Sequence, residues 1–141
     1  MLDRSIPLAL PFMEENEEGI TKHPGRYDNK KRKIFLLSPC GFPEYSHFDA
    51  LVATFKQIAK MSGSSYLGEI LRPSASLLLM HEEREELAPY LKQLENAGKQ
   101  LAENGKIDQK TLDLLQEPWI SVKEFRERAN EYFEGELKKI T

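Results

Sequence analysis

The fold is decided by a short apolar run, Lys33-Ile34-Phe35-Leu36-Leu37-Ser38. A continuous apolar run of this length is typical of a strand that is buried on both faces of a parallel sheet. The next segment is Pro39-Cys40-Gly41-Phe42-Pro43. Because proline lacks the N–H that a ladder or a helix would use, this segment should continue neither. The sequence therefore predicts a strand over residues 33–38 and a tight turn after it.

A helix and a second strand are predicted after that turn. Ser46 and Asp49 are spaced like a capping box, and apolar residues then recur at helical spacing: Phe48, Leu51, Val52, Phe55, Ile58 and Ala59. Gly63 is placed to end the helix in a left-handed turn. A strand over residues 65–71, closed by Pro73, would complete a βαβ unit of the α/β class.

The remaining segments are predicted to be mainly helical. Residues 1–13 suggest a short helix or turn interrupted by two prolines, and residues 14–32 a polar loop with or without a short irregular strand. The state of the apolar segment 74–80 is left open. We expect a single domain over residues 1–141, divided into an N-terminal remnant (1–32), the βαβ unit (33–73) and a helical extension (74–141).

Three helices are predicted in the extension. The first covers roughly residues 85–103 and ends at Gly105; its inward face would be Leu87, Tyr90, Leu91, Leu94, Ala97 and Leu101. Asp108 would cap a short helix that ends before Pro118. A capping box at Ser121 and Glu124 would begin the last helix, with an apolar face of Val122, Phe125, Ala129, Tyr132, Phe133 and Leu137.

Composition narrows the classes of function. The net charge is −3, which argues against a dedicated nucleic-acid binder, and the basic run at residues 30–33 is interpreted as a solvated loop. No stretch has the length and apolarity of a membrane span. The single cysteine, Cys40, precludes an internal disulfide and suits a reducing compartment, so we expect a cytoplasmic protein.

Three stretches together resemble one family: LDRSIPLALP (2–11), CGFPE (40–44) with Phe48-Asp49 after it, and GEILRP (68–73). In this order they are similar to the second half of the NAD(P)H-dependent FMN reductases, also called multimeric flavodoxins, which include the iron–sulfur flavoproteins. The resemblance implies a partial flavodoxin-like fold, with residues 33–38 and 65–71 as the fourth and fifth strands of a parallel sheet. The first three strands and the FMN phosphate loop would then be absent.

The resemblance also implies a cofactor-binding wall. The loop after the first predicted strand would border the isoalloxazine ring of FMN through Ser38, Pro39, Cys40, Gly41 and Phe42. Gly41 would let the backbone approach the ring, and Phe42 would pack beside it. The family usually has Ser-Thr ahead of Cys-Gly-Phe, whereas this chain has Ser38-Pro39, so one N–H is lost. The alternative, favoured for this sequence alone, is a strand-to-helix turn with Phe42 buried.

The expected function follows from that family. The chain would be a flavodoxin-like NAD(P)H-dependent flavin oxidoreductase without its FMN phosphate-binding half, inactive and without bound FMN when isolated. The alternative is a non-enzymatic, self-associating module of the same fold. Because two strands do not form a stable sheet and would leave both edges unpaired, we expect a homo-oligomer or a separate chain that supplies the N-terminal half.

Other chemistries are weaker hypotheses. Cys40 and His47 suggest a thiol nucleophile and its base, but no third residue orients the histidine, so a spectator thiol is preferred. Gly63-Ser64-Ser65 is the nearest imitation of a phosphate loop, yet a helix end and a ladder need its N–H groups. The three histidines lack metal-ligand spacing and one cysteine cannot hold an iron–sulfur cluster. Trp119 is interpreted as a packing anchor.

Overall fold

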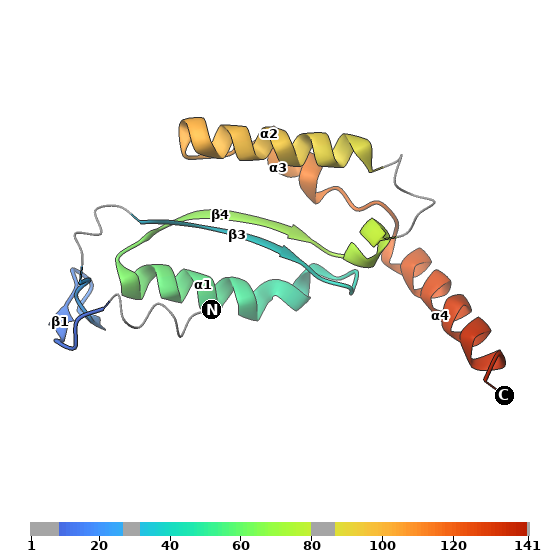
Figure 1. The fold of residues 1–141 in the computed structure, drawn as a ribbon, viewed down its shortest axis with the longest axis horizontal. Helices are drawn as coiled ribbons and strands as arrows, with labels where there is room; N and C mark the ends of the chain where they lie inside the picture. Colours follow the sequence, from blue (N-terminus) through green and yellow to red (C-terminus); the bar gives the residue numbers. More distant parts are fainter. Residues whose placement is uncertain (1–8, 27–31, 80–86, 141) are drawn as a thin grey trace. The chain divides into compact units, whose positions relative to one another are not determined.

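The computed structural model describes residues 9–26, 32–79 and 87–140. These residues form a mixed α/β protein with two small two-stranded sheets and four α-helices (Figure 1). The chain divides into two compact units, residues 1–36 with 50–69 and residues 37–49 with 70–141. None of the described helices combines the length and apolarity needed to cross a bilayer.

The principal sheet pairs β3 (Lys33–Pro39) with β4 (Ser65–Arg72). Ser65 N–H donates to Arg32 O at 2.9 Å at one end, and Cys40 N–H donates to Arg72 O at 2.9 Å at the other. Both strands therefore run in the same direction, as the arrows in Figure 1 show. The ladder passes through Pro39, where we expected it to stop. Because the N–H of Cys40 points to β4, the nitrogen of Pro39 points away from it, and proline is tolerated on that side.

The described residues do not bury both faces of β3, as was expected of a strand in a complete parallel sheet. Leu36 is 6% exposed, but Leu37 is 58% exposed. Successive side chains on a strand point to opposite faces, so the described residues cover one face of β3 and leave the other open at Leu37. The predicted strand is confirmed, but none of the described residues covers the face of the strand that carries Leu37.

Helix α1 (Asp49–Ser62) joins the two strands. A 3₁₀ turn, Tyr45–Phe48, precedes it, and Glu44 at the start of that turn makes no capping bond through its side chain. The predicted capping box at Ser46 is therefore not the start of the helix, because the turn already occupies that position. The predicted apolar face is confirmed at its ends, since Phe48 and Ala59 are each 2% exposed.

The end of α1 agrees with its predicted glycine stop. Gly63 has φ +64°, a left-handed conformation that favours glycine. Ser64 N–H donates to Ala59 O, and Ser65 N–H donates to Arg32 O in the neighbouring strand. These N–H groups serve the helix end and the ladder, as expected, so Gly63-Ser64-Ser65 has no geometry for cradling a phosphate.

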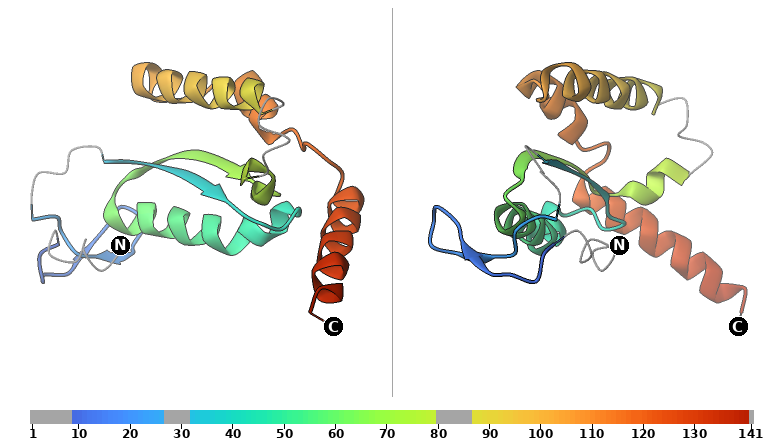
Figure 2. Two further views of the ribbon diagram at one scale, coloured as in Figure 1. Left: turned by 45° about the vertical axis from the view of Figure 1, so that its right-hand side comes forward. Right: turned by 60° about the vertical axis from the view of Figure 1, so that its left-hand side comes forward.

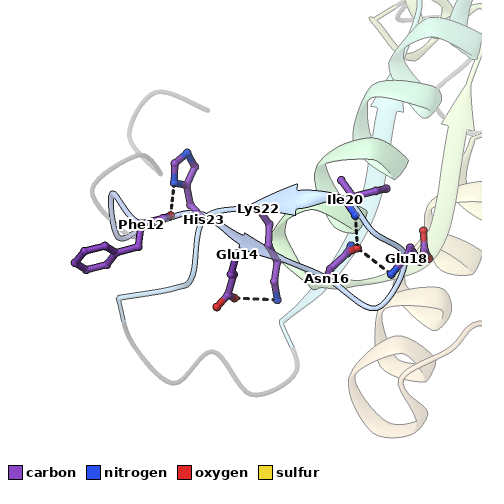
Figure 3. A network of polar contacts seen from close by, with 7 residues as sticks. All are labelled: Phe12, Glu14, Asn16, Glu18, Ile20, Lys22 and His23. Carbon is purple, nitrogen blue, oxygen red and sulfur yellow. Dashed lines mark hydrogen bonds and ion pairs between the residues drawn. The ribbon is translucent and has the colours of Figure 1, made fainter.

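Residues 14–32 were predicted to be mainly loop, and they contain a small antiparallel hairpin. Its strands are β1 (Glu14–Glu15) and β2 (Thr21–Lys22). Asn16 Oδ1 accepts from the N–H groups of Glu18 and Ile20 at 3.0 and 2.9 Å, which builds the turn between them (Figure 3). Most of the helix or turn predicted over residues 1–13 lies outside the described residues.

The second unit carries the helical extension, and its local signals are confirmed. The elements are a 3₁₀ turn Ala75–Leu79, α2 (Ala88–Asn104), α3 (Gln109–Gln116) and α4 (Val122–Lys138). Gly105 ends α2 with φ 68°, Asp108 accepts from Thr111 N–H at 2.7 Å, and Ser121 accepts from Glu124 N–H at 3.1 Å. Helices α2 and α3 lie side by side in every view (Figures 1 and 2).

Burial of the helix faces agrees with the periodicity in α2 and departs from it in α4. Leu87, Tyr90 and Ala97 are buried as predicted, whereas Leu91 is 52% exposed and was assigned inward wrongly. Helix α4 has no buried residue, and its predicted inward face is open to solvent over much of its length. Helical periodicity identifies an apolar face, but it does not provide an element to cover that face.

Candidate functional site

The loop after β3 and the turn after β4 are joined by backbone hydrogen bonds. Besides the bond from Cys40 N–H to Arg72 O, Ala75 N–H donates to Cys40 O at 2.8 Å and Ser74 N–H donates to Phe42 O at 2.9 Å. Ser74 adopts φ 54°, a conformation uncommon outside glycine. The carboxyl ends of the two parallel strands therefore meet in one fixed structure, at the edge where α/β sheets bind ligands.

The five predicted site residues lie at the end of β3 (Ser38 and Pro39) and in the loop that follows it (Cys40, Gly41 and Phe42). Ser38 and Cys40 are half-buried, while Pro39 and Gly41 are exposed. Phe42 is 62% exposed, so the alternative with a buried Phe42 is wrong. A Cβ atom added to Gly41 would meet nothing within 4 Å. Open backbone and an exposed aromatic ring therefore lie together at the carboxyl edge of the sheet.

Phe42 and His47 form a stacked pair beside the loop. Their ring centroids lie 4.8 Å apart, with an interplanar angle of 28°. His47 Nε2 is 3.4 Å from a Glu44 carboxylate oxygen, and the other oxygen of Glu44 bonds to Arg126. The Arg126 hydrogen bond is the main reason that the pKa of Glu44 is lowered. Sequence reasoning missed Glu44 as the group that orients His47.

This arrangement does not support a thiol nucleophile. None of the described contacts joins the Cys40 thiol to the His47 ring, which instead contacts Phe42 and Glu44. Cys40 is half-buried, as a spectator thiol would be. Nor do the described residues group three or more His, Cys, Asp or Glu side chains as a metal site would require. His81 and the acidic run at residues 82–86 lie outside them.

Sequence reasoning also missed Arg72, the last residue of β4. Its side chain is only 3% exposed, and Nη2 donates to Glu117 O at 3.0 Å. The guanidinium lies 4.3 Å from the centre of the Trp119 ring and 5.1 Å from that of Tyr90. The two rings meet edge to face at 5.1 Å, so Trp119 is packed as an anchor. The sequence signal that could have identified Arg72 is a basic residue directly after the apolar strand residues Ile70 and Leu71.

Burial governs the electrostatics around Arg72. The pKa of Tyr90 is raised chiefly by burial, and the Arg72 cation opposes that shift only in part. Arg72 Nε and Nη1 are buried and have no hydrogen-bond partner among the described residues. The site thus contains a desolvated cation with N–H groups available to an acceptor.

Comparison with known proteins gives no relative for this chain: no family model, curated protein or solved structure matches it.

Proposed function

We propose that this chain is one part of a flavodoxin-like, NAD(P)H-dependent flavin reductase, and that its loop at residues 39–43 forms the wall beside the isoalloxazine ring. The observation that carries the proposal is the exposed Phe42 ring next to an open Gly41, at the carboxyl ends of two parallel strands. That edge is where doubly wound sheets bind nucleotides and flavins. Hydride chemistry would belong to the flavin, while this loop supplies apolar contact and shape.

The loop is suited to touching a flavin but not to holding one alone. Pro39 has no N–H, and the N–H of Cys40 is already bonded to Arg72 O. Among the described residues, no glycine-rich turn begins a helix after a strand, the arrangement that binds phosphate groups. A glycine-rich loop for the FMN phosphate must therefore come from outside the described residues, from another segment or another chain.

The principal sheet also supports a chain that forms one wall of the flavin site and depends on a partner for the rest. The described part of the chain pairs β3 only with β4, and Leu37 on β3 is 58% exposed. Further strands would pair along the free edges of this two-stranded sheet, and helices that accompany them would cover the face that carries Leu37. We place these strands and helices, and with them the phosphate loop, on a partner.

Nuclear magnetic resonance with added FMN tests this proposal. We expect weak binding, with amide shifts concentrated at residues 38–42. Gly41→Val should abolish those shifts without unfolding the chain, because a Cβ atom at this exposed position would meet nothing within 4 Å in this structure. Gly98→Ala is the matched control, since Gly98 is also unobstructed but lies in α2. Shifts that are absent, or that lie elsewhere and survive Gly41→Val, would contradict the proposal.

A second candidate function, a self-associating module, is favoured by helix α4. Its apolar side chains are exposed, from 37% at Val122 to 82% at Ile140 just beyond the helix. The first half of the helix has a small excess of basic residues (Lys123, Arg126 and Arg128 against Glu124 and Glu127), and the second half has an excess of acidic residues (Glu131, Glu134 and Glu136 against Lys138). Two antiparallel copies would bury both apolar faces and would place the half with the basic excess opposite the half with the acidic excess.

Light scattering after gel filtration tests the second function. We expect a dimer at micromolar concentration that the double variant Tyr132→Glu, Phe133→Glu converts to a monomer. Leu91→Glu is the control, because Leu91 is similarly exposed but lies on α2. Added salt should weaken the dimer if charge pairing contributes. A wild-type monomer, or a dimer that the α4 variant leaves intact, would exclude this face as the interface.

A further inference from the structure

Arg72 is a buried cation for which the described residues provide no counter-ion. It is 3% exposed, and no described carboxylate lies within ion-pair distance of its guanidinium. A charge removed from water is costly unless it is paired and hydrogen-bonded. A buried, unmatched arginine therefore needs an explanation in a folded protein.

The observed contacts satisfy only one of the three nitrogen atoms of the guanidinium with a hydrogen bond. Glu117 O, directly after the C-terminus of α3, accepts from Nη2, and the negative end of that helix favours a cation. The faces of Trp119 and Tyr90 add cation–π attraction. A purely structural clamp between β4 and the α3–α4 connection would need these contacts alone. It leaves the N–H groups of Nε and Nη1 without a role.

We propose that Arg72 binds an oxyanion, the carboxylate or phosphate group of a small ligand, at the carboxyl ends of β3 and β4. The planar guanidinium is the side chain best suited to such groups, and its unused N–H donors are already desolvated and held in place. The carboxyl edge of a parallel sheet is also the usual position for a bound ligand. The site shares this edge of the sheet with the proposed flavin wall, but it is inferred from the contacts of Arg72 and does not depend on flavin binding.

Trp119 is the part of the site that must respond to binding. Its ring covers the guanidinium at 4.3 Å and is itself only half-buried. An anion that reaches Nε or Nη1 must displace groups packed around them, and Trp119 is a neighbour of the guanidinium that is partly exposed to solvent. Since it is the only tryptophan of the chain, its fluorescence reports on this site alone.

The test is a titration of the purified chain with inorganic phosphate, and separately with acetate, at constant ionic strength. We expect a saturable change in Trp119 fluorescence, and the anion that binds more tightly identifies the chemistry of the ligand group. Arg72→Gln should weaken the response by about tenfold or more, the loss expected for hydrogen bonds to a charged group. Arg126→Gln, which removes an exposed arginine that pairs with Glu44, should leave it unchanged.

A measurement on the wild-type chain keeps the proposal testable if Arg72→Gln fails to fold. The Nε–H resonance of Arg72 should be protected from exchange and should shift when the bound anion is added. An Nε–H signal that neither anion moves would show that the group is already satisfied and would overturn the proposal. So would a fluorescence response that is not saturable or that is equal in Arg72→Gln.

Discussion

Replacing Leu115 with alanine should destabilise the second unit strongly, whereas the same change at its neighbour should not. Leu115 is 0% exposed and Leu114 is 42% exposed, although both lie in α3. Leucine to alanine removes three carbon atoms, worth about 2.4 kcal/mol when fully buried. The enclosed cavity adds to that loss, so we expect Leu115→Ala to cost about 3–4 kcal/mol. Leu114→Ala should cost about 1 kcal/mol, because much of its side chain already contacts water.

The Leu115→Ala substitution should also disturb the contacts of Arg72. Leu115 anchors the end of α3, and the two carbonyls that follow it, those of Gln116 and Glu117, accept from Tyr45 Oη and Arg72 Nη2. A loosened helix end would hold these acceptors less firmly. Trp119 emission should therefore shift toward that of the unfolded chain in Leu115→Ala before any denaturant is added.

The free energy of unfolding of both variants is measured by urea denaturation, monitored by Trp119 fluorescence and by circular dichroism. The comparison is internal, since the two leucines share a helix, a residue type and a substitution. Equal losses at the two positions, or a smaller loss at Leu115, would refute the burial assigned to α3. A large loss at Leu115 without a change in native Trp119 emission would refute only the proposed coupling to Arg72.

Further predictions concern the α2–α3 pair. Thr111→Val should cost about 1 kcal/mol in urea unfolding, because the buried hydroxyl accepts from Gln100 Nε2 at 3.1 Å. Gly105→Ala should lower stability by about 1 kcal/mol because φ is 68°, whereas Gly98→Ala, inside a helix with open space around it, should raise stability by up to about 1 kcal/mol. The N–H of Thr111 lowers the pKa of Asp108 from 3.8, so this carboxylate stabilises the fold above its unfolded pKa, and the benefit is lost as the pH falls through the folded pKa. Asp108→Asn keeps a capping acceptor that does not titrate, so its melting temperature should fall less steeply in acid than that of the wild type.

Features that depend on neighbouring residues along the chain were predictable. The two strands of the βαβ unit, the glycine stops at Gly63 and Gly105 and the caps at Asp108 and Ser121 all follow from local backbone geometry. The loop at residues 39–43 was also placed correctly at the carboxyl edge of the sheet. These signals act over a few residues, so tertiary contacts did not override them.

Burial and pairing were decided by the tertiary structure. The same apolar pattern gives buried residues in α2 and exposed ones in α4, because α3 packs along α2 whereas the described residues provide no comparable packing for α4. Arg72 lay inside a recognised motif, yet only the approach of Tyr90, Trp119 and Glu117 O, from well over a dozen residues further along the chain, makes it a desolvated cation. Sequence alone predicted the two principal strands and the four α-helices, since these depend on local dihedral and hydrogen-bond preferences, but it did not predict the 3₁₀ turns and left the β1–β2 hairpin undecided. Which side chains are covered, and which polar atoms are left without a partner, depends on contacts between distant segments that periodicity does not encode.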